Sequence, residues 1–127
     1  MTAIGLILTI KIGVTTLLMA GPFLLMPERR LAEITGVTGN GSIFRLYGIA
    51  ILALLTGYAS GFWTISEGRF PWGIAVMGVV SNTGAAMVLI ASGAWRRTPA
   101  ITGFVVAVSL ALVLALLNSS YAMAPLW

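Results

Sequence analysis

The chain contains no cysteine and no histidine among its 127 residues, and its only acidic residues are Glu28, Glu33 and Glu67. The first two absences exclude disulfides, thiolate nucleophiles, imidazole bases and the usual ligands of zinc, haem and iron–sulfur clusters. All three acids fall in predicted loops, and a general acid–base pair needs two positioned titratable groups. The sequence therefore predicts no enzyme, no metal site and no cofactor, with a Schiff base at Lys11 as the one covalent chemistry left open.

Charge is also scarce. Charged residues make up 8% of the chain, whereas an ordinary globular domain has about a quarter. Hydrophobic residues make up 59%, and the mean hydropathy is +1.05. A net charge of +4 in a soluble protein would suggest nucleic acid as a partner. Here the arginines stand at the ends of long apolar blocks, where they suit lipid headgroups, so we expect membrane lipids and no nucleic acid as partners.

Four apolar blocks predict four membrane-crossing helices, at about residues 3–26, 43–63, 71–94 and 100–121. Each holds roughly 20 residues or more, enough to cross a hydrocarbon core about 30 Å thick. Because the links are short, neighbouring helices must be antiparallel. The predicted fold is an all-α, polytopic membrane protein: one antiparallel four-helix bundle spanning residues 1–127.

The first block and its loop have features that local chemistry predicts. The block lacks the basic start of a signal peptide, so we expect a retained helix. Gly21-Pro22 should kink or end its regular part, because proline removes a backbone donor. A short interfacial helix is predicted at residues 28–35, with Leu31 and Ile34 facing lipid.

Arginine placement predicts the orientation. Loops one and three are richest in arginine, loop two carries only Arg69, and neither terminal tail is basic. The positive-inside bias therefore places loops one and three in the cytoplasm and both termini outside. Aromatic residues at the ends of the blocks predict an outer belt of Trp63, Phe70, Trp72, Tyr121 and Trp127, and an inner belt of Phe44, Tyr47 and Trp95. The arginines expected at headgroups are Arg29, Arg30, Arg45, Arg96 and Arg97.

Small residues recur at spacing four along every block, which favours close helix approach in lipid. Four such stripes can all be consumed inside one bundle, or one of them, on the fourth helix above all, can dock another subunit. The stripes are Gly103, Ala107, Ala111, Ala115 and Ser119 in the fourth block; Ala53, Gly57 and Gly61 in the second; Gly78, Asn82 and Ala86 in the third; and Gly5, Thr9 and Gly13 in the first.

Lys11 and Asn82 are the polar residues at membrane depth. Lys11 lies about 12 Å below the outer end of its helix, where a charge is costly and marks a functional candidate. It could snorkel to the interface, hydrogen-bond to Asn82, or meet an acid from a partner subunit, lipid or ligand. Arg45, near the cytoplasmic interface, could pair with Glu28 or Glu33, with headgroup contact as the simpler account.

The stretch Pro27-Glu-Arg-Arg-Leu-Ala followed by Ile43-Phe-Arg-Leu-Tyr-Gly48 resembles small bacterial four-helix membrane proteins of the DoxX-like type. The Arg-x-Tyr-Gly turn of that family falls on Arg45, Tyr47 and Gly48. This resemblance covers about a third of the chain and implies a fold and a bacterial inner membrane rather than an activity. Size and helix count also look like the small multidrug-resistance exporters, but the first helix here carries Lys11 in place of their glutamate, which would repel a cationic drug.

These features favour a non-catalytic accessory or assembly subunit that packs within a larger complex of membrane proteins. The alternative is a small homo-oligomeric transporter or channel, with Lys11 and Asn82 lining an anion-friendly path. A third possibility is the binding of a lipid, quinone or pigment between helices, which leaves little mark in a sequence.

Overall fold

A computed structural model describes residues 1–126 and is helical apart from short links and one isolated bridge between Thr2 and Pro125. Four helical segments are long and apolar enough to cross a membrane, which confirms the predicted all-α membrane fold. They are Ala3–Leu25, α4 (Gly41–Ser66), α5 (Trp72–Ala91) and α6 (Pro99–Leu117).

The first crossing is made of three pieces: α1 (Ala3–Thr15), a π-helical turn η1 (Thr16–Ala20) and α2 (Gly21–Leu25). The amide of Gly21 donates to the Thr16 carbonyl, five residues back. Pro22 has no backbone N–H to donate, and its ring crowds the carbonyl of the preceding turn. A widened turn accommodates both the missing hydrogen bond and the ring. The predicted irregularity at Gly21-Pro22 therefore takes the form of a π turn rather than the end of the helix.

The last crossing ends earlier than predicted. Helix α6 stops at Leu117 because Asn118 leaves helical geometry, with φ −130° and ψ 53°. The short helix α7 (Ser119–Met123) comes next and packs against α1. The expected helix to residue 121 was therefore wrong, and Ser119 lies beyond the break rather than in line with Ala115.

The interfacial helix predicted at residues 28–35 is present as α3 (Glu28–Thr35), which ends at Gly36 in the left-handed conformation (φ 70°). Ile34 is exposed as expected, but Leu31 is buried and points into the protein. The expectation that both face lipid was wrong for Leu31, which is buried on a helix that packs against α4. In the link between α5 and α6, Gly93 (φ 73°) precedes a 3₁₀ turn, η2 (Ala94–Arg96).

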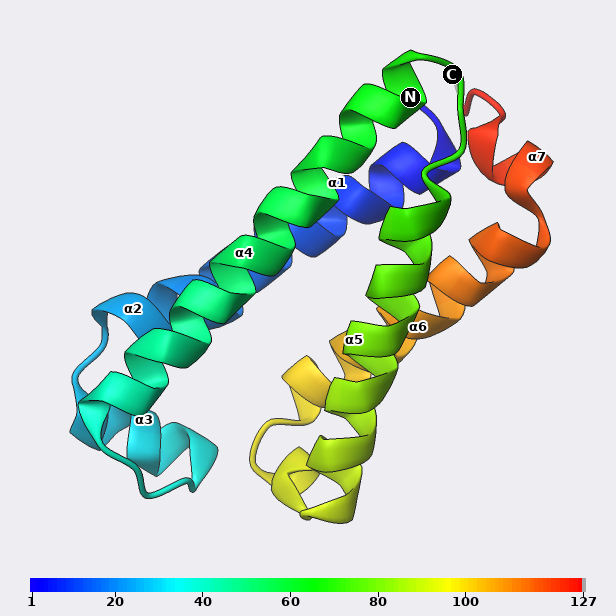
Figure 1. Cartoon of the computed structure of the whole chain (residues 1–127). Helices are drawn as coiled ribbons and strands as arrows, with labels where there is room; N and C mark the ends of the chain where they lie inside the picture. Colours follow the sequence, from blue (N-terminus) through cyan, green and yellow to red (C-terminus); the bar gives the residue numbers. More distant parts are fainter. Residues whose placement is uncertain (127) are drawn as a thin grey trace.

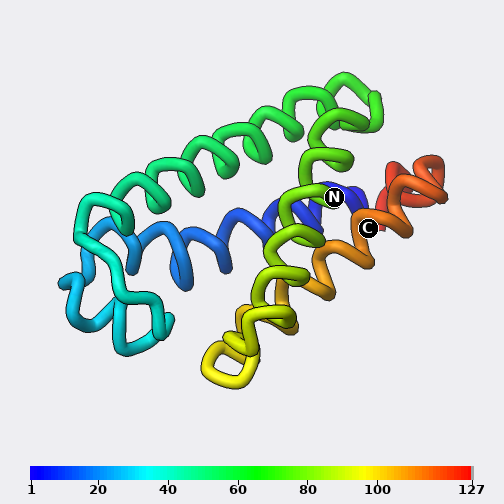
Figure 2. Tube along the Cα trace, turned by 60° about the horizontal axis from the view of Figure 1, so that its bottom comes forward, coloured from blue at the N-terminus to red at the C-terminus, as the bar shows by residue number. Residues whose placement is uncertain are grey.

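The crossings form two antiparallel pairs, α1–α2 with α4 and α5 with α6 (Figure 1). Both chain ends and the α4–α5 link lie at one end of the molecule, and α3 and η2 lie at the other (Figure 1). The two pairs meet near the terminal end and diverge toward α3 and η2 in both views (Figures 1 and 2). The polar residues of the candidate site lie where the pairs meet.

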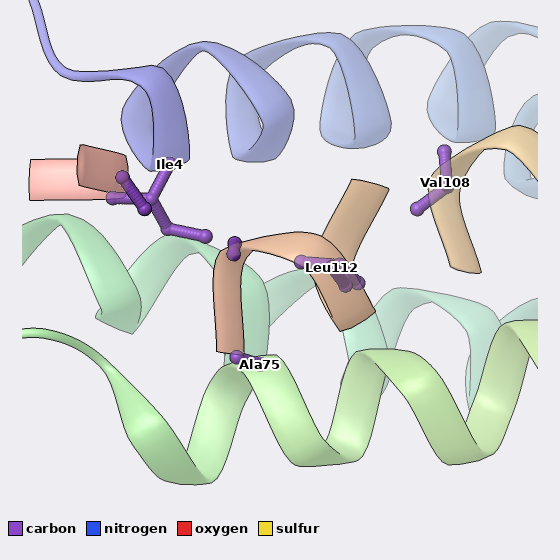
Figure 3. Packing of buried hydrophobic residues seen from close by; sticks show 6 residues of the cluster. Ile4, Ala75, Val108 and Leu112 are labelled. Carbon is purple, nitrogen blue, oxygen red and sulfur yellow. The ribbon is translucent and has the colours of Figure 1, made fainter. Parts of the chain in front are cut away.

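Contact between the pairs depends on small side chains. Ile4 of α1, Ala75 of α5 and Leu112 of α6 converge in one fully buried cluster (Figure 3). Gly78 of α5 faces the Tyr58 hydroxyl of α4, in the other pair, which lies 3.1 Å from where a Cβ would stand; Leu112 of its own pair lies closer still. A second cluster joins α1, η1 and α4, and its buried members are Leu8, Ala20, Ile51, Leu55 and Tyr58.

Candidate intramembrane polar site

Lys11 does not reach the interface. Its side chain is buried, with 6% exposed, and Nζ donates to Oδ1 of Asn82 over 2.7 Å. The two residues come from α1 and α5, one from each helix pair. Of the three arrangements left open by the sequence, snorkelling is therefore not adopted, and the hydrogen bond to Asn82 is formed.

The Asn82 amide is fully used. Its Nδ2 donates to the Tyr58 hydroxyl over 3.1 Å and to the Gly78 carbonyl over 2.7 Å, one turn earlier in α5. The Tyr58 hydroxyl also lies 3.2 Å from Oγ of Ser81. Because Gly78 has no side chain, the Tyr58 hydroxyl fits against α5, 3.1 Å from where a Cβ would stand. This network fixes the Asn82 oxygen toward Lys11.

Two aromatic rings flank the Lys11 ammonium. Nζ lies 5.3 Å from the ring centroid of Phe104 in α6 and 5.9 Å from that of Tyr58 in α4. Both distances fall within the range of cation–π attraction. Four helices therefore contribute to the surroundings of one amine, and within residues 1–126 they offer it one oxygen acceptor and two ring faces. An ammonium has three N–H donors, so its hydrogen-bonding capacity exceeds what these groups take up.

A cavity of about 60 Å³ lies beside Lys11, between the two helix pairs. Thr15, one turn along α1, also lines it, and its buried hydroxyl has no hydrogen-bond partner within residues 1–126. A cavity needs a volume of roughly 10–15 Å³, in the same measure, to hold a single water molecule. This cavity can therefore take a small polar group. The remaining lining is largely apolar and includes Met19, Leu54 and Val105.

Arg45 has a structural role that the sequence analysis did not anticipate. Its two terminal nitrogens donate to the carbonyls of Phe23 (2.7 Å) and Met26 (2.8 Å), which end the first crossing without helical partners. The pairing with Glu28 or Glu33 is not formed among residues 1–126, where Glu33 lies 3.4 Å from Arg29 instead.

The other residues of the Arg-x-Tyr-Gly turn also serve this junction. The Tyr47 ring packs edge-on against Phe23, with centroids 5.0 Å apart. Gly48 lets α4 approach α2, since a Cβ there would stand 2.9 Å from Leu24. Phe44, predicted in the inner belt, is buried and packs against Phe23 at 6.0 Å. The turn therefore joins the start of α4 to the end of the first crossing.

The small-residue stripes differ in whether they are buried inside the bundle or exposed on its surface. The α5 stripe of Gly78, Asn82 and Ala86 is buried inside the bundle. The α4 stripe is buried at Gly61, against Leu8, and exposed at Ala53. The α1 stripe is buried at Gly5 and exposed at Thr9 and Gly13.

On α6 the bulkier residues face inward and the stripe faces outward. Thr102, Val105, Val108 and Leu112 are buried. Gly103 and Ala107 are exposed, Ala111 is half-buried, and Ala115 is buried. We call Gly103, Ala107 and Ala111 the smooth α6 face. It leads into a groove of about 440 Å³, lined by Ala3, Ile7, Ala111, Leu114, Ala115, Asn118, Tyr121 and Ala122.

The remaining predicted interface residues lie at the two ends. Arg29 and Arg30 are exposed, Arg96 stacks over Trp95 at 5.6 Å, and Arg97 reaches Gly36 across the gap between the helix pairs. At the terminal end Trp63 and Trp72 are exposed, Phe70 packs edge-on against Trp72, and Tyr121 is exposed. Trp127 lies outside the described residues.

The sequence analysis identified Lys11 and Asn82 but missed Tyr58, Thr15 and Phe104. A mid-span tyrosine hydroxyl was the one signal available, because such a group needs a partner in lipid. Comparison with known protein families, curated proteins and solved structures found no match for the chain. The residues of the site are therefore the basis for any functional conclusion.

Proposed function

We propose that the protein is a non-catalytic accessory or assembly subunit, which binds a transmembrane helix of another membrane protein through its smooth α6 face. The outward orientation of Gly103 and Ala107 carries this proposal. Helices in lipid associate where small residues allow their backbones to approach closely. The α5 stripe is consumed within the bundle, whereas the α6 stripe is turned away from it, and the adjoining groove extends the surface.

The test replaces Ala107 with leucine and compares the variant with Leu110→Phe, a change at an exposed, already bulky position of the same helix. We expect a partner protein to co-purify in mild detergent with the parent chain and with Leu110→Phe, and to be lost with Ala107→Leu. A chain that is monomeric without any co-purifying protein, or a partner that is retained by both variants, would contradict the proposal.

A second function, transport by a homo-oligomer, is favoured by one observation: Lys11 and Asn82 are hydrogen-bonded beside a cavity. Lys11→Met tests this second function. Anion flux by the parent chain in liposomes that is lost with Lys11→Met supports transport, whereas no flux, or equal flux by both chains, contradicts it.

We also propose that the protein resides in a bacterial inner membrane, with α3 and η2 in the cytoplasm and the termini outside. The exposed Arg29, Arg30 and Arg96 support this orientation. At the opposite end Arg69 pairs with Glu67, and its hydrogen bond holds the pKa of that carboxyl below its usual value. The natural chain has no cysteine, so Ser66→Cys and Thr98→Cys can each be probed with an impermeant maleimide. We expect intact cells to be labelled at residue 66 and not at residue 98. The opposite pattern would show the opposite orientation.

A further inference from the structure

The space around Lys11 has the chemistry of a ligand site that is distinct from the smooth α6 face. Lys11 donates one hydrogen bond, to a neutral amide oxygen, and the three acids of the chain all lie outside the four crossings. Thr15, 4% exposed, lines the same cavity, and its buried hydroxyl has no hydrogen-bond partner among residues 1–126. Positions 11 and 15 lie on the same face of α1, one turn apart. Two residues with donor groups therefore lie beside one space, and one of them can carry a positive charge.

The matching group is a carboxylate. It has two oxygens, so one can accept from Lys11 and the other from Thr15, and its charge complements the ammonium. A buried charge is stable when it is paired and hydrogen-bonded, and within the crossings this chain supplies no acid for Lys11.

The surroundings of the cavity identify the rest of the ligand as an apolar chain. Along α4 the lining residues are Tyr58, Leu55, Leu54, Ile51 and Tyr47, and they run about 16 Å toward the end where the helix pairs diverge. Tyr58 is buried at the inner end of this face and Tyr47 is 47% exposed at the other. A hydrated inorganic anion would lose its water here against mostly apolar side chains.

We propose that this site binds a fatty-acid-like amphiphile. Its carboxylate is held by Lys11 and Thr15, and its acyl chain leaves the cavity between α4 and α5 toward the lipid. The cavity of about 60 Å³ accommodates the carboxylate and the first methylenes, and the remainder lies where α4 and α5 diverge (Figure 2). This proposal does not rest on the subunit function, since it involves α1, α4 and α5 rather than the outer side of α6.

The experiment uses the full chain in lipid nanodiscs and a dodecanoate that carries a diazirine on its acyl chain. Photolabelling followed by peptide mapping should place the label on α4 and α5 near Leu54 and Ala85, which both line the cavity. Unlabelled dodecanoate should compete saturably. Failure to label these segments, or labelling that dodecanoate does not reduce, would overturn the proposal.

Variants separate a specific site from partition into lipid. Thr15→Val keeps the shape of the side chain and should weaken binding about tenfold, by removal of a hydrogen bond to a charged group. Thr16→Val is the matched control, because Thr16 is exposed and its hydroxyl bonds to the Ile12 carbonyl; its affinity should change less than about twofold. Lys11→Met should weaken binding by at least about thirtyfold. Equal binding by the parent, Thr15→Val and Lys11→Met would overturn the proposal.

Two competitors identify the chemistry. Dodecanol has the chain without the charge, and acetate has the charge without the chain. Both should compete far less well than dodecanoate. Equal competition by dodecanol would show an apolar groove only, and equal competition by acetate would show a small-anion site; either result would overturn the amphiphile.

Discussion

The two ends of the bundle are held together by different interactions. At the end that carries the termini, the helix pairs touch through close apolar contacts, with Ile4, Ala75 and Leu112 in one cluster and Ile74 of α5 against Gly61 of α4. At the end that carries α3 and η2, the pairs diverge; α2 and α4 still pack closely through Phe23 and Gly48 within one pair, and two arginines add contacts between distant segments. Arg45 joins α4 to the end of the first crossing, and Arg97 reaches Gly36.

This difference shows how a small membrane bundle can be tight at one end and open at the other. Small residues give direct contact between backbones, which leaves no space between helices. Arginine reaches carbonyls over a longer distance, and therefore joins segments without bringing the helices together. The Lys11 cavity lies at the boundary between the tight and the open end, and four comparisons of variants measure what each end contributes.

The largest effect is expected at this boundary. Asn82→Leu removes the acceptor of a buried amine and the partner of Tyr58, and it should lower the free energy of unfolding by about 3 kcal/mol. The double variant Lys11→Met/Asn82→Leu should recover much of that loss, because no buried donor at position 11 is then left unsatisfied. Reversible unfolding by SDS in detergent micelles provides the measurement. Strictly additive losses would show that the two residues are not coupled.

The next largest effect tests the tight end. Gly78→Ala places a methyl group against Leu112 and Tyr58 and should cost about 2 kcal/mol by overpacking. Gly84→Ala is the matched control on the same helix, because its Cβ would meet nothing within 4 Å. That variant should be neutral or stabilised by up to about 1 kcal/mol. If both variants unfold alike, close approach at Gly78 does not stabilise the packing of α5 against α6 and α4.

At the open end, Arg45→Met should lower stability by about 1.5 kcal/mol, since two charge-assisted hydrogen bonds to helix-end carbonyls are lost. Amide hydrogen exchange should also rise in α3 while that of α5 and α6 stays unchanged. Arg30→Met, at an exposed position of the same end, serves as the control. Equal effects of the two variants would mean that Arg45 acts only through the general charge of this end.

The smallest effect compares two turns. Gly36→Ala and Gly68→Ala each force a residue with a side chain into positive φ, which costs about 1 kcal/mol. Only at Gly36 would the new Cβ also meet Arg97, while at Gly68 it meets nothing within 4 Å. A greater loss for Gly36→Ala in the same SDS assay reports the Arg97 contact, and equal losses would show that this contact contributes nothing.

Much of the fold could be predicted because long uncharged blocks determine where helices cross lipid. The misses involve features that depend on tertiary contact. Leu31 turns inward because α4 lies beside it, and the break at Asn118 lets α7 reach α1. Neither contact leaves a periodic trace in the sequence.

The site was predicted in part for a related reason. Depth alone singled out Lys11 and Asn82, but the rotation of each helix about its axis decides which neighbours face them. A stripe at spacing four looks the same whether it faces the bundle, as at Gly78, or lipid, as at Ala107. Tyr58, Thr15 and Phe104 became visible only once those rotations were known.

The π turn has a consequence for how this chain tolerates changes in length. Buried side chains along the first crossing succeed one another at 4, 8, 11 and 15, in steps of three or four, and the next is Ala20, a step of five; Gly5, also buried, has no side chain. The wide turn thus absorbs one surplus residue without rotating the inward side of α2. A shortening by one residue between Thr15 and Ala20 could therefore be absorbed by a return to ordinary α-helical winding, whereas the same deletion in α5 would rotate every later side chain away from its neighbours.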